Sequence, residues 1–441
     1  MNPNPTTSRR RWLKSVGASA SVATVTSSGW LPALSAATAA AGRERKHCVL
    51  LWMSGGPSQI DTFDMKPKHG NGGTIKEVST SVPGIRFSEH LPRLAKHADS
   101  LAILRGISTK EGDHQRGATL MRTGFMTGAP VNYPSIGCSL SKALVSDFGS
   151  ASTLPAYVTI APGALGRESI RPGFLGPKYA ATVVEASGVD AQAFAQLRVD
   201  YLDRAANITR ERMETRLELW RSMQQDYLQS RPRENVIAHD TVYRAAIEMM
   251  NSDAKSAFDL SKESTDVREK YGRGSFGQGC LMARRLIERG APLVEVTLGD
   301  GLGWDTHADN FAAVGRLCEQ LDRGWATLMD ELRDRDLLER TTILWAGEFG
   351  RTPQINTMGG RDHYPQAFTC VLAGGGVAGG QTYGETSKDG REVVDGKMDQ
   401  KDLLSTLCSA LGVNPATENI AEGGRPIAIA DGQVIDKVVR T

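Results

Sequence analysis

Carboxylates and imidazoles gather in two short segments of this sequence, with one further acid between them. Asp305 and His307 lie in Trp-Asp-Thr-His, and Asp362 and His363 lie in Gly-Arg-Asp-His-Tyr-Pro. Glu348 follows an apolar run in Gly-Glu-Phe-Gly-Arg-Thr-Pro. A mixture of carboxylate oxygens and imidazole nitrogens suits Zn²⁺ or a similar divalent ion. Only eight histidines are present, so two beside carboxylates in this way favour a metal site.

Purely structural roles are the alternative for the same residues. Asp305 can begin a turn or cap a helix, and His363 can bond a backbone carbonyl without any ion. Arg351 follows Glu348 by three positions and is compatible with two roles. It can clamp an anion near the metal, or it can pair with Glu348 as a structural ion pair.

Short apolar runs precede these segments and must position them. Each run is rich in β-forming residues and is bounded by glycine or polar residues. The runs are 48–53, 101–104, 156–160, 293–298, 342–346 and 368–373. With helical patterns between several of them, they predict an α/β sheet covered on both faces.

Ligands of open α/β sheets bind outside the carboxyl ends of the strands. We therefore expect 48–53, 293–298 and 342–346 to be neighbouring buried strands. The segments that follow them should then open on one edge of the sheet; these segments are 54–64, 299–310 and 347–363.

Two stretches differ from this strand and helix alternation. Residues from about 188 to 275 are rich in helix formers and charge, with apolar residues at helical spacing, and predict a helical insertion. Residues from about 374 to 396 are rich in glycine and predict a surface hairpin. The six cysteines lack C-x-x-C spacing and are expected to be buried free thiols.

The first 41 residues have the pattern of a twin-arginine export signal. Arg9, Arg10, Arg11 and Lys14 precede a stretch without charge, and 37–39 reads Ala-Thr-Ala. A membrane anchor fits less well, because the stretch is rich in Ser, Thr, Gly and Ala. The pattern predicts a mature chain of residues 42–441 that is periplasmic or secreted and crosses the membrane already folded.

The charge and hydropathy of the mature chain indicate neither a nucleic-acid partner nor a membrane span. Removal of the four basic residues of the signal takes the formal net charge of +2 slightly below zero, so a nucleic-acid partner is not indicated. No later apolar run has the length of a membrane span. The sequence does not indicate an oligomeric state.

Several motifs together resemble the secreted domain-of-unknown-function 1501 family, common in planctomycete-type bacteria. In order, they are LLWMSGGPSQIDTFDMKP, GWDTHADNF, GEFGRTP, GRDHYP and LAGGGVAGGQTYGET. The resemblance covers nearly the whole mature chain. That family in turn resembles, more distantly, the alkaline phosphatase and sulfatase superfamily. The resemblance implies a doubly wound, mostly parallel sheet of that type, and a site with one or two metals that hydrolyses phosphate or sulfate esters.

The metal ligands of the superfamily transfer unevenly to this chain. Asp305 and His307 resemble its aspartate and histidine pair at a shorter spacing, and His363 resembles its later histidine ligand. Glu348 and Phe349 stand where the superfamily has aspartate and histidine, so phenylalanine replaces one imidazole. The resemblance thus implies one metal position with Glu348 as a surviving ligand, and a second that is weak or absent.

The first strand and the nucleophile depart further from the superfamily. The strand ends in Ser54 where an aspartate is usual, which leaves Asp61 or Asp64 to supply a carboxylate. In GDHQRGATLMRTG, His114 stands near the position of the sulfatase nucleophile. His114 is therefore a candidate nucleophile, general acid or further ligand. Ser58 or Ser54 is the other candidate nucleophile, although serines in such loops are typical of turns.

Three functions follow. The first is a metal-dependent hydrolase of sulfate or phosphate esters, with polysaccharides among the candidate substrates. The second is a catalytically degenerate member that binds sulfated or phosphorylated glycans. The third is a serine hydrolase, although the loop lacks the G-x-S-x-G motif.

For the first function, the expected catalytic residues are His114 and Arg351, and the expected metal ligands are Asp305, His307, Glu348, His363 and Asp61. The sequence does not distinguish zinc from calcium, magnesium or manganese.

The export signal generates the first testable prediction. Replacing Arg9 and Arg10 with lysine should leave precursor in the cytoplasm, whereas replacing Arg43 and Arg45 with lysine, beyond the expected cleavage near Ala39 to Ala41, should not. Fractionation and N-terminal sequencing measure both. Normal accumulation of the Arg9/Arg10 variant outside the cytoplasm would show that another route is used.

Overall fold

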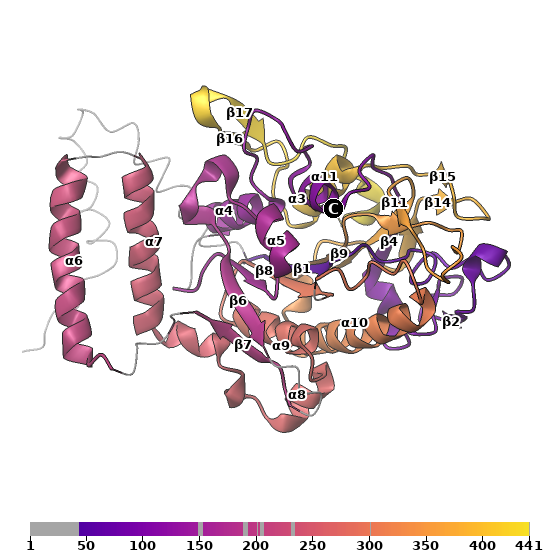
Figure 1. Cartoon of the computed structure of the whole chain (residues 1–441), viewed down its shortest axis with the longest axis horizontal. Coiled ribbons are helices and arrows are strands. Elements are labelled where there is room, and N and C mark those ends of the chain that lie inside the picture. Colours follow the sequence, from indigo (N-terminus) through magenta and orange to yellow (C-terminus); the bar gives the residue numbers. More distant parts are fainter. Residues whose placement is uncertain are drawn as a thin grey trace, which may run out of the picture. The chain divides into compact units, whose positions relative to one another are not determined.

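A nine-stranded sheet forms the centre of the described chain. The computed structural model describes residues 44–148, 153–187, 193–200, 202, 207–230, 234–299 and 301–440; the expected export signal lies outside them. The strand order is β13-β4-β12-β9-β1-β8-β5-β6-β7 (Figure 1). All pairs in this sheet are parallel except those made by β12 and β7. The predicted α/β fold class with a mostly parallel sheet is confirmed.

The three central strands are buried on both faces. They are β1 (His47–Met53), β8 (Leu293–Leu298) and β9 (Thr341–Ala346), and every residue in them is buried. β1 pairs in parallel with both neighbours, as predicted. Alternate residues of β1 belong to two separate hydrophobic cores, one on each face of the sheet. A strand covered on both faces needs a continuous apolar run, and this is the pattern that the sequence shows.

The outer strands were predicted less completely. β4 (Leu101–Ile107), β5 (Tyr157–Ile160) and β12 (Phe368–Gly374) confirm predicted runs. The prediction missed β6 (Thr182–Ser187), β7 (Gln196–Val199) and β13 (Gln381–Tyr383). These three lie toward the edges of the sheet and are partly exposed. Strands that are only partly buried do not need the continuous apolar run of a strand covered on both faces.

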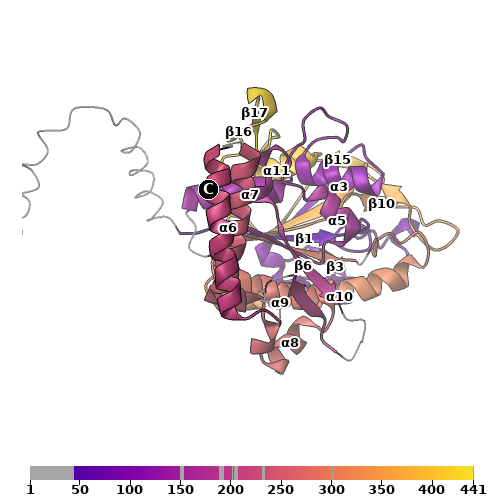
Figure 2. The same ribbon diagram turned by 60° about the vertical axis from the view of Figure 1, so that its left-hand side comes forward.

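Helices cover both faces of the sheet. α9 (Ser275–Glu288) and α10 (Asn310–Arg333) contribute to one core. α3 (His114–Thr123), α4 (Ile136–Phe148) and α11 (Gln400–Ala410) contribute to the other. Figures 1 and 2 show α9 and α10 on one side of the sheet and α3 and α11 on the opposite side. This two-sided cover is the doubly wound arrangement that was expected.

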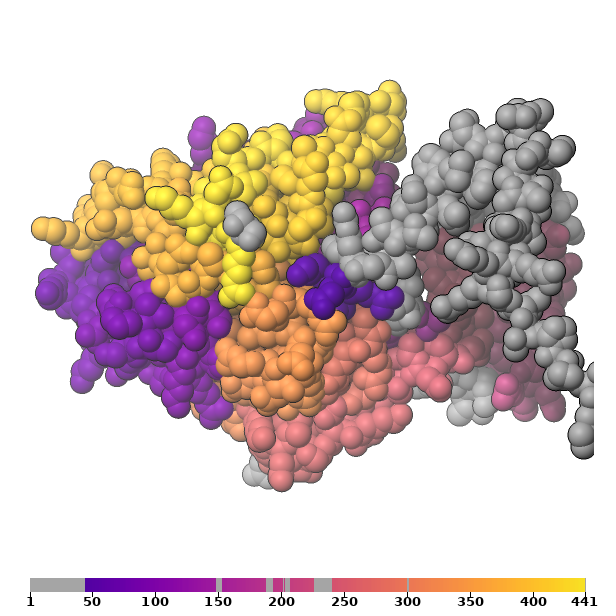
Figure 3. All heavy atoms as spheres, turned by 180° about the vertical axis from the view of Figure 1, so that it is seen from behind, coloured from indigo at the N-terminus to yellow at the C-terminus, as the bar shows by residue number. Residues whose placement is uncertain are grey.

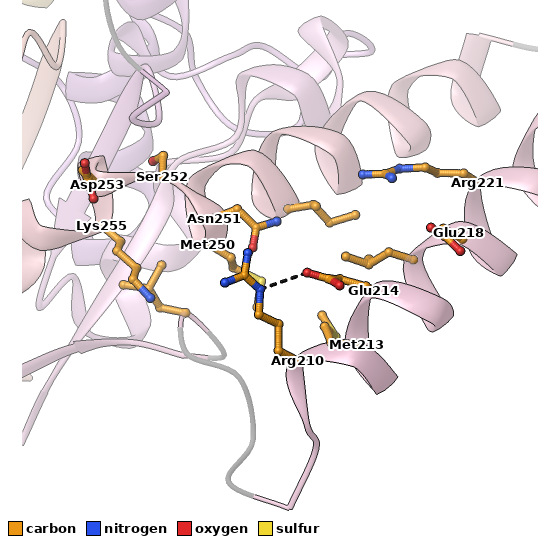
Figure 4. Close-up of a pocket in the computed structure, with 13 residues that line it drawn as sticks. Arg210, Met213, Glu214, Glu218, Arg221, Met250, Asn251, Ser252, Asp253 and Lys255 are labelled. Atoms are coloured by element: carbon orange, nitrogen blue, oxygen red, sulfur yellow. Dashed lines mark hydrogen bonds and ion pairs between the residues drawn. The ribbon is translucent and has the colours of Figure 1, made fainter.

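The described residues between 188 and 275 form three α-helices and one strand of the main sheet. The helices are α6 (Arg210–Ser230), α7 (Glu234–Asn251) and α8 (Thr265–Tyr271), and the strand is β7, antiparallel to β6. A cleft of about 570 Å³ lies between α6 and α7. Figure 4 shows Met213 and Met250 at this cleft, beside the ion pair of Arg210 and Glu214.

The glycine-rich stretch contains both a sheet strand and a hairpin. β13 pairs with β4, and β14 (Glu385–Thr386) pairs with β15 (Val393–Asp395). Smaller pairs elsewhere are β2 (Glu77–Ser79) with β3 (Arg86–Ser88), β10 (Gly350–Arg351) with β11 (His363–Tyr364), and β16 (Glu418–Ile420) with β17 (Pro426–Ala428). Seen from behind, the C-terminal segment lies on the surface in yellow (Figure 3). There the Arg440 amide donates to the Gly376 carbonyl at 2.9 Å.

The fold also bears on the cysteine thiols and on membrane-spanning helices. All six cysteines are free and buried, as predicted. Among the described helices, none combines the length and the hydrophobicity that a membrane span requires.

A buried ion pair ties α3 to the centre of the sheet. Arg122 Nη2 lies 2.7 Å from Glu295 Oε1, and both side chains are almost fully buried. The Tyr157 hydroxyl donates to Glu295 Oε2 at 2.7 Å, and the guanidinium lies 3.9 Å from the centroid of the Trp52 ring. Because α3 begins at His114, this pair helps to fix the position of that histidine.

The buried pair generates a stability prediction. Arg122→Met should lower the free energy of unfolding by about 3–5 kcal/mol, because it leaves the Glu295 carboxylate buried without its cation. Arg116→Met on the same helix is the control; its side chain is 55% exposed and pairs with Glu111, so Tm should hardly change. Denaturant and thermal unfolding measure both. Equal small effects would show that the buried pair contributes little.

Candidate metal centre

Five strand ends and one helix start meet at one edge of the sheet. The segments after β1, β8 and β9 leave the sheet at this edge because the three strands are parallel. β12 is antiparallel to both β9 and β4, so the segment before β12 and the segment after β4 reach the same edge. α3 begins in the latter segment, where the Asp113 carboxylate accepts from the Arg116 amide at 3.0 Å and caps the helix.

The carboxylate of Asp305 lies at the centre of the side chains gathered there. Its Oδ1 is 3.0 Å from His307 Nε2 and 3.1 Å from His363 Nε2. Its Oδ2 is 3.2 Å from His114 Nε2. The ligand atoms of His114, Asp305 and His363 all lie within 4.8 Å of one another. These three residues form a candidate metal site, and His307 contacts two of them.

Each of the three imidazoles is oriented by an oxygen acceptor at its other nitrogen. The Nδ1 contacts are His114 with Glu348 Oε1 at 2.7 Å, His307 with Asp362 Oδ1 at 2.8 Å, and His363 with the Gly112 carbonyl at 2.7 Å. A carboxylate or carbonyl oxygen only accepts, so each Nδ1 carries a hydrogen. With Nδ1 fixed in this way, each ring turns its Nε2 toward Asp305, which is the orientation of metal-binding histidines.

The spacing of the Nε2 atoms fits a cation. His307 Nε2 and His363 Nε2 are only 3.1 Å apart, and two facing lone pairs at this distance repel unless a proton or a metal lies between them. Ligand atoms around a tetrahedral ion with bonds of about 2.0–2.1 Å are roughly 3.3 Å apart. The imidazole nitrogens and the carboxylate oxygens thus fit a zinc-type ion in chemistry, and the His307 and His363 nitrogens fit its ligand spacing.

Glu348 belongs to the cluster but does not occupy the place expected of a ligand. Its Oε1 accepts from the Gly55 amide at 2.8 Å as well as contacting His114. Its Oε2 is buried and has no hydrogen-bond partner among the described residues. The side chain is 2% exposed, so Glu348 orients His114 from inside the protein.

Arg351 lies beneath Asp305 and is completely buried. Its Nη1 is 2.6 Å from Asp305 Oδ1, and its Nε donates to the Gly56 carbonyl at 2.9 Å. Its Nη2 donates to the Gly55 carbonyl. The geometry does not fit the expected anion clamp, because the guanidinium is already committed, and its partner is Asp305 rather than Glu348. Gly55 lets the backbone of Asp305 approach closely, because it has no side chain. Its φ is +111°, and a Cβ there would lie 2.5 Å from the Asp305 backbone nitrogen.

Asp61 and Asp64 lie outside the cluster. Arg361 donates to Asp61 through Nε at 2.7 Å and Nη2 at 3.0 Å, and Asn310 donates to the same carboxylate at 2.8 Å. Asp61 and Arg361 are both fully buried. Asp64 pairs with Lys66 at 3.0 Å. The expectation that Asp61 joins the metal ligands is therefore not supported, since its oxygens are occupied in bracing two loops.

The protonation states reflect these contacts. Burial by itself lowers the pKa of His114, but hydrogen bonds with Asp305 and Glu348 outweigh it and raise that pKa to about 9. Burial would raise the pKa of Asp305, but contacts with His114, His363 and Arg351 hold it well below its usual range. An imidazole must give up the proton on Nε2 before that nitrogen can bind a metal, so protons and a metal compete for the site.

The two serines considered as nucleophiles, Ser54 and Ser58, make no hydrogen bond with a histidine of the cluster among the described residues. Ser54 Oγ donates to the Gly301 carbonyl at 2.9 Å. Ser58 is 1% exposed, and its Oγ has no hydrogen-bond partner in the described part of the chain. A serine nucleophile with a histidine base is therefore not supported. Phe349 packs its ring 4.9 Å from that of His114 and 4.6 Å from that of His363, and forms an apolar wall behind the imidazoles.

Sequence reasoning missed the roles of Asp362 and Gly112. Asp362 was noted as a possible ligand, yet it orients His307 from the exposed side of the cluster. The Gly112 carbonyl, which holds His363, gives no signal in the side-chain pattern. The adjacency of Asp362 to His363 was the one usable clue.

Solved structures with similar chains include several hydrolases and a synthase. The sulfatase PsFucS1 from Pseudoalteromonas sp. is 13% identical at a TM-score of 0.39, with 87% of this chain and 70% of that chain covered. The phosphonate monoester hydrolase from Silicibacter pomeroyi is 10% identical at 0.38, with 89% and 76% covered. The lipoteichoic acid synthase LtaP from Listeria monocytogenes is 8% identical at 0.37, with 88% and 74% covered.

These likenesses carry no inference about the residues or the activity of this chain, because the identities and TM-scores are low. No curated protein is significantly similar to the sequence. The family described as "Protein of unknown function (DUF1501)" matches residues 45–439. This match spans nearly all of the described residues, including every residue of the cluster. The chain belongs to the DUF1501 family.

Proposed function

We propose that this protein is an exported, metal-dependent hydrolase of sulfate or phosphate esters, with polysaccharides among its substrates. One observation carries the proposal: three imidazoles, each fixed at Nδ1, turn their Nε2 atoms toward the Asp305 carboxylate at the ligand-binding edge of an α/β sheet. The residues that would hold the ion are His114, His307, His363 and Asp305. A bound divalent ion supplies Lewis acidity toward an ester oxygen.

The exposure of the cluster defines the side from which a substrate reaches it. His307 is 40% exposed and His363 is 26% exposed, whereas Glu348 is 2% exposed and Arg351 is buried. The substrate therefore approaches from the side of His307. Phe349, Glu348 and Arg351 close the opposite side and exclude water from it.

Residues around the cluster keep the imidazoles and the carboxylate in place. Glu348 and Asp362 accept from Nδ1–H of His114 and His307, which makes the opposite nitrogens more basic toward a cation. Arg351 holds Asp305 from below and neutralises part of its charge. His114 is the least exposed of the three histidines and serves here as a ligand, so the nucleophile is water rather than a side chain.

Binding without turnover is the second candidate function. It is favoured by the committed hydrogen bonds of Arg351, which leave no buried guanidinium to face an anion in the described part of the cluster. A sulfated or phosphorylated glycan would then be held at the same edge without cleavage of its ester.

Metal binding is tested by content and stability together. Asp305→Asn and His363→Ala should each lose stoichiometric metal and lower Tm, because an ion that binds only the folded state stabilises it. Glu348→Gln should keep the ion but weaken its affinity by about 10–100-fold, since it alters only the orienting acceptor. Elemental analysis, chelator competition and thermal unfolding measure these effects.

His90→Ala serves as the control, because His90 lies outside the cluster, in a surface cleft with Phe311 and Arg316. It should retain full metal content. Wild-type protein purified without chelators that carried no metal, or full metal in both Asp305→Asn and His363→Ala, would require the site to be abandoned.

Ester hydrolysis is tested with aryl sulfate and aryl phosphate. The wild type should hydrolyse at least one of them, lose activity on chelation and regain it when the metal is restored. His307→Ala should lower kcat/KM by about 10-fold or more, because it removes one of the four proposed ligands of the ion. Stoichiometric metal without hydrolysis of either ester, together with binding of a sulfated oligosaccharide, would favour the binding function.

A further inference from the structure

A second cleft begins one residue from the histidine cluster. It has a volume of about 400 Å³ and lies between α3, the segment 125–133 and the end of α5 (Gly163–Ser169). Gln115, which directly follows His114, lines one end of it, and Thr119 and Thr123 continue the same wall. We refer to it as the α3 cleft. From these contacts we propose that it binds the neutral sugar rings of a glycan whose anionic ester is held at the histidine cluster.

The geometry of α3 connects the two places. Residues four apart lie on one face of a helix, so Gln115, Thr119 and Thr123 form one stripe. The stripe is about 12 Å long, from the helical rise over eight residues. His114 stands at its start, with its imidazole turned to Asp305 and Glu348. A chain of sugar rings lying along the stripe would place its terminal ester beside the cluster.

The lining suits polyhydroxylated rings. Gln115 and Asn132 each offer both donors and an acceptor, and Glu168 and Arg171 add planar acceptors and donors. Phe125 and Tyr133, stacked with ring centroids 3.7 Å apart, add aromatic surface at the far end. An aromatic surface flanked by planar polar side chains matches a sugar, which presents apolar C–H faces and hydroxyl edges.

The charges of the cleft and of the cluster indicate which part of the glycan binds at each place. Glu168 and Arg171 are the charged lining residues of the α3 cleft, so their charges balance, and Glu168 also accepts from Gln115 Nε2. A balanced lining does not select a polyanion. The cation-binding residues lie at the cluster instead, so we place the sulfate or phosphate there and the uncharged rings in the cleft.

This proposal rests on the proposed function, and its test separates the two. The probes are an oligogalactoside sulfated only on its terminal ring and an oligomannoside phosphorylated only on its terminal ring, with an aryl sulfate and an aryl phosphate as small substrates. Tyr133→Ala and Asn132→Ala should each weaken the binding of at least one oligosaccharide by roughly tenfold, the effect of losing one well-placed contact. Calorimetry on the full mature protein measures this.

Hydrolysis of the small esters distinguishes a cleft effect from a folding defect. Both variants should keep kcat/KM for the aryl esters close to the wild-type value, because these substrates do not extend into the cleft. Asn132→Ala guards against a folding defect, since its side chain is exposed, whereas Tyr133 stacks on Phe125. Tyr179→Ala is the matched control, because Tyr179 is partly buried like Tyr133 but lies outside the cleft; it should change neither readout.

The outcomes are separable. Oligosaccharide binding that weakens in both variants, in a wild type that hydrolyses no ester, would support the cleft and reject the proposed hydrolase. Aryl ester hydrolysis by a wild type that binds no oligosaccharide, or whose oligosaccharide affinity is unchanged in both variants, would reject the cleft alone. Equal losses on oligosaccharide and aryl ester would also reject it, because they indicate a structural role.

Discussion

The carboxylate of Asp305 is the constraint on which the rest of the site depends. It receives Arg351 from inside the protein and faces three imidazole nitrogens on the other side. No regular element contains it, since it lies in the segment between β8 and α10. The position of this one group therefore decides whether His114, His307 and His363 converge on one point or only line a loop.

Buried polar braces hold that position. The Arg361 to Asp61 pair joins residues 300 apart in sequence, and Asn310 extends the network to Thr306, whose hydroxyl donates to Asn310 Oδ1 at 2.5 Å. The Arg361 amide donates to the Thr306 carbonyl at 3.0 Å. These bonds fasten the Trp-Asp-Thr-His segment to the segment before β12. Buried charges of this kind are tolerated because their hydrogen bonds are satisfied, and they fix geometry more than they add stability.

The parts of this structure that could be predicted from sequence are those encoded locally. The central strands are covered on both faces, so β1, β8 and β9 appear as continuous apolar runs. Asp305 with His307, and Asp362 with His363, lie within two positions of each other in sequence and could be recognised as a candidate site. Their arrival at one edge followed from the rule that ligands bind outside the carboxyl ends of parallel strands.

The remaining features depend on partners that are distant in sequence. Arg351 was expected to clamp an anion, but its role is set by the Gly55 and Gly56 carbonyls and by Asp305. Asp61 was expected to bind metal, yet Arg361 occupies both of its oxygens. Glu348 and His114 are 234 positions apart, so nothing local shows that one orients the other. Each of these contacts joins a side chain to a partner that only the tertiary fold brings near.

The most direct measurement of the central claim is the X-ray absorption spectrum of the purified mature protein at the edge of the metal that it retains. If His114, His307, His363 and Asp305 hold the ion, the spectrum will show mainly imidazole nitrogen with carboxylate oxygen at about 2.0–2.2 Å, and anomalous diffraction will place the ion among these four residues. A spectrum dominated by sulfur ligands, an ion placed elsewhere, or the absence of any retained metal would contradict the claim.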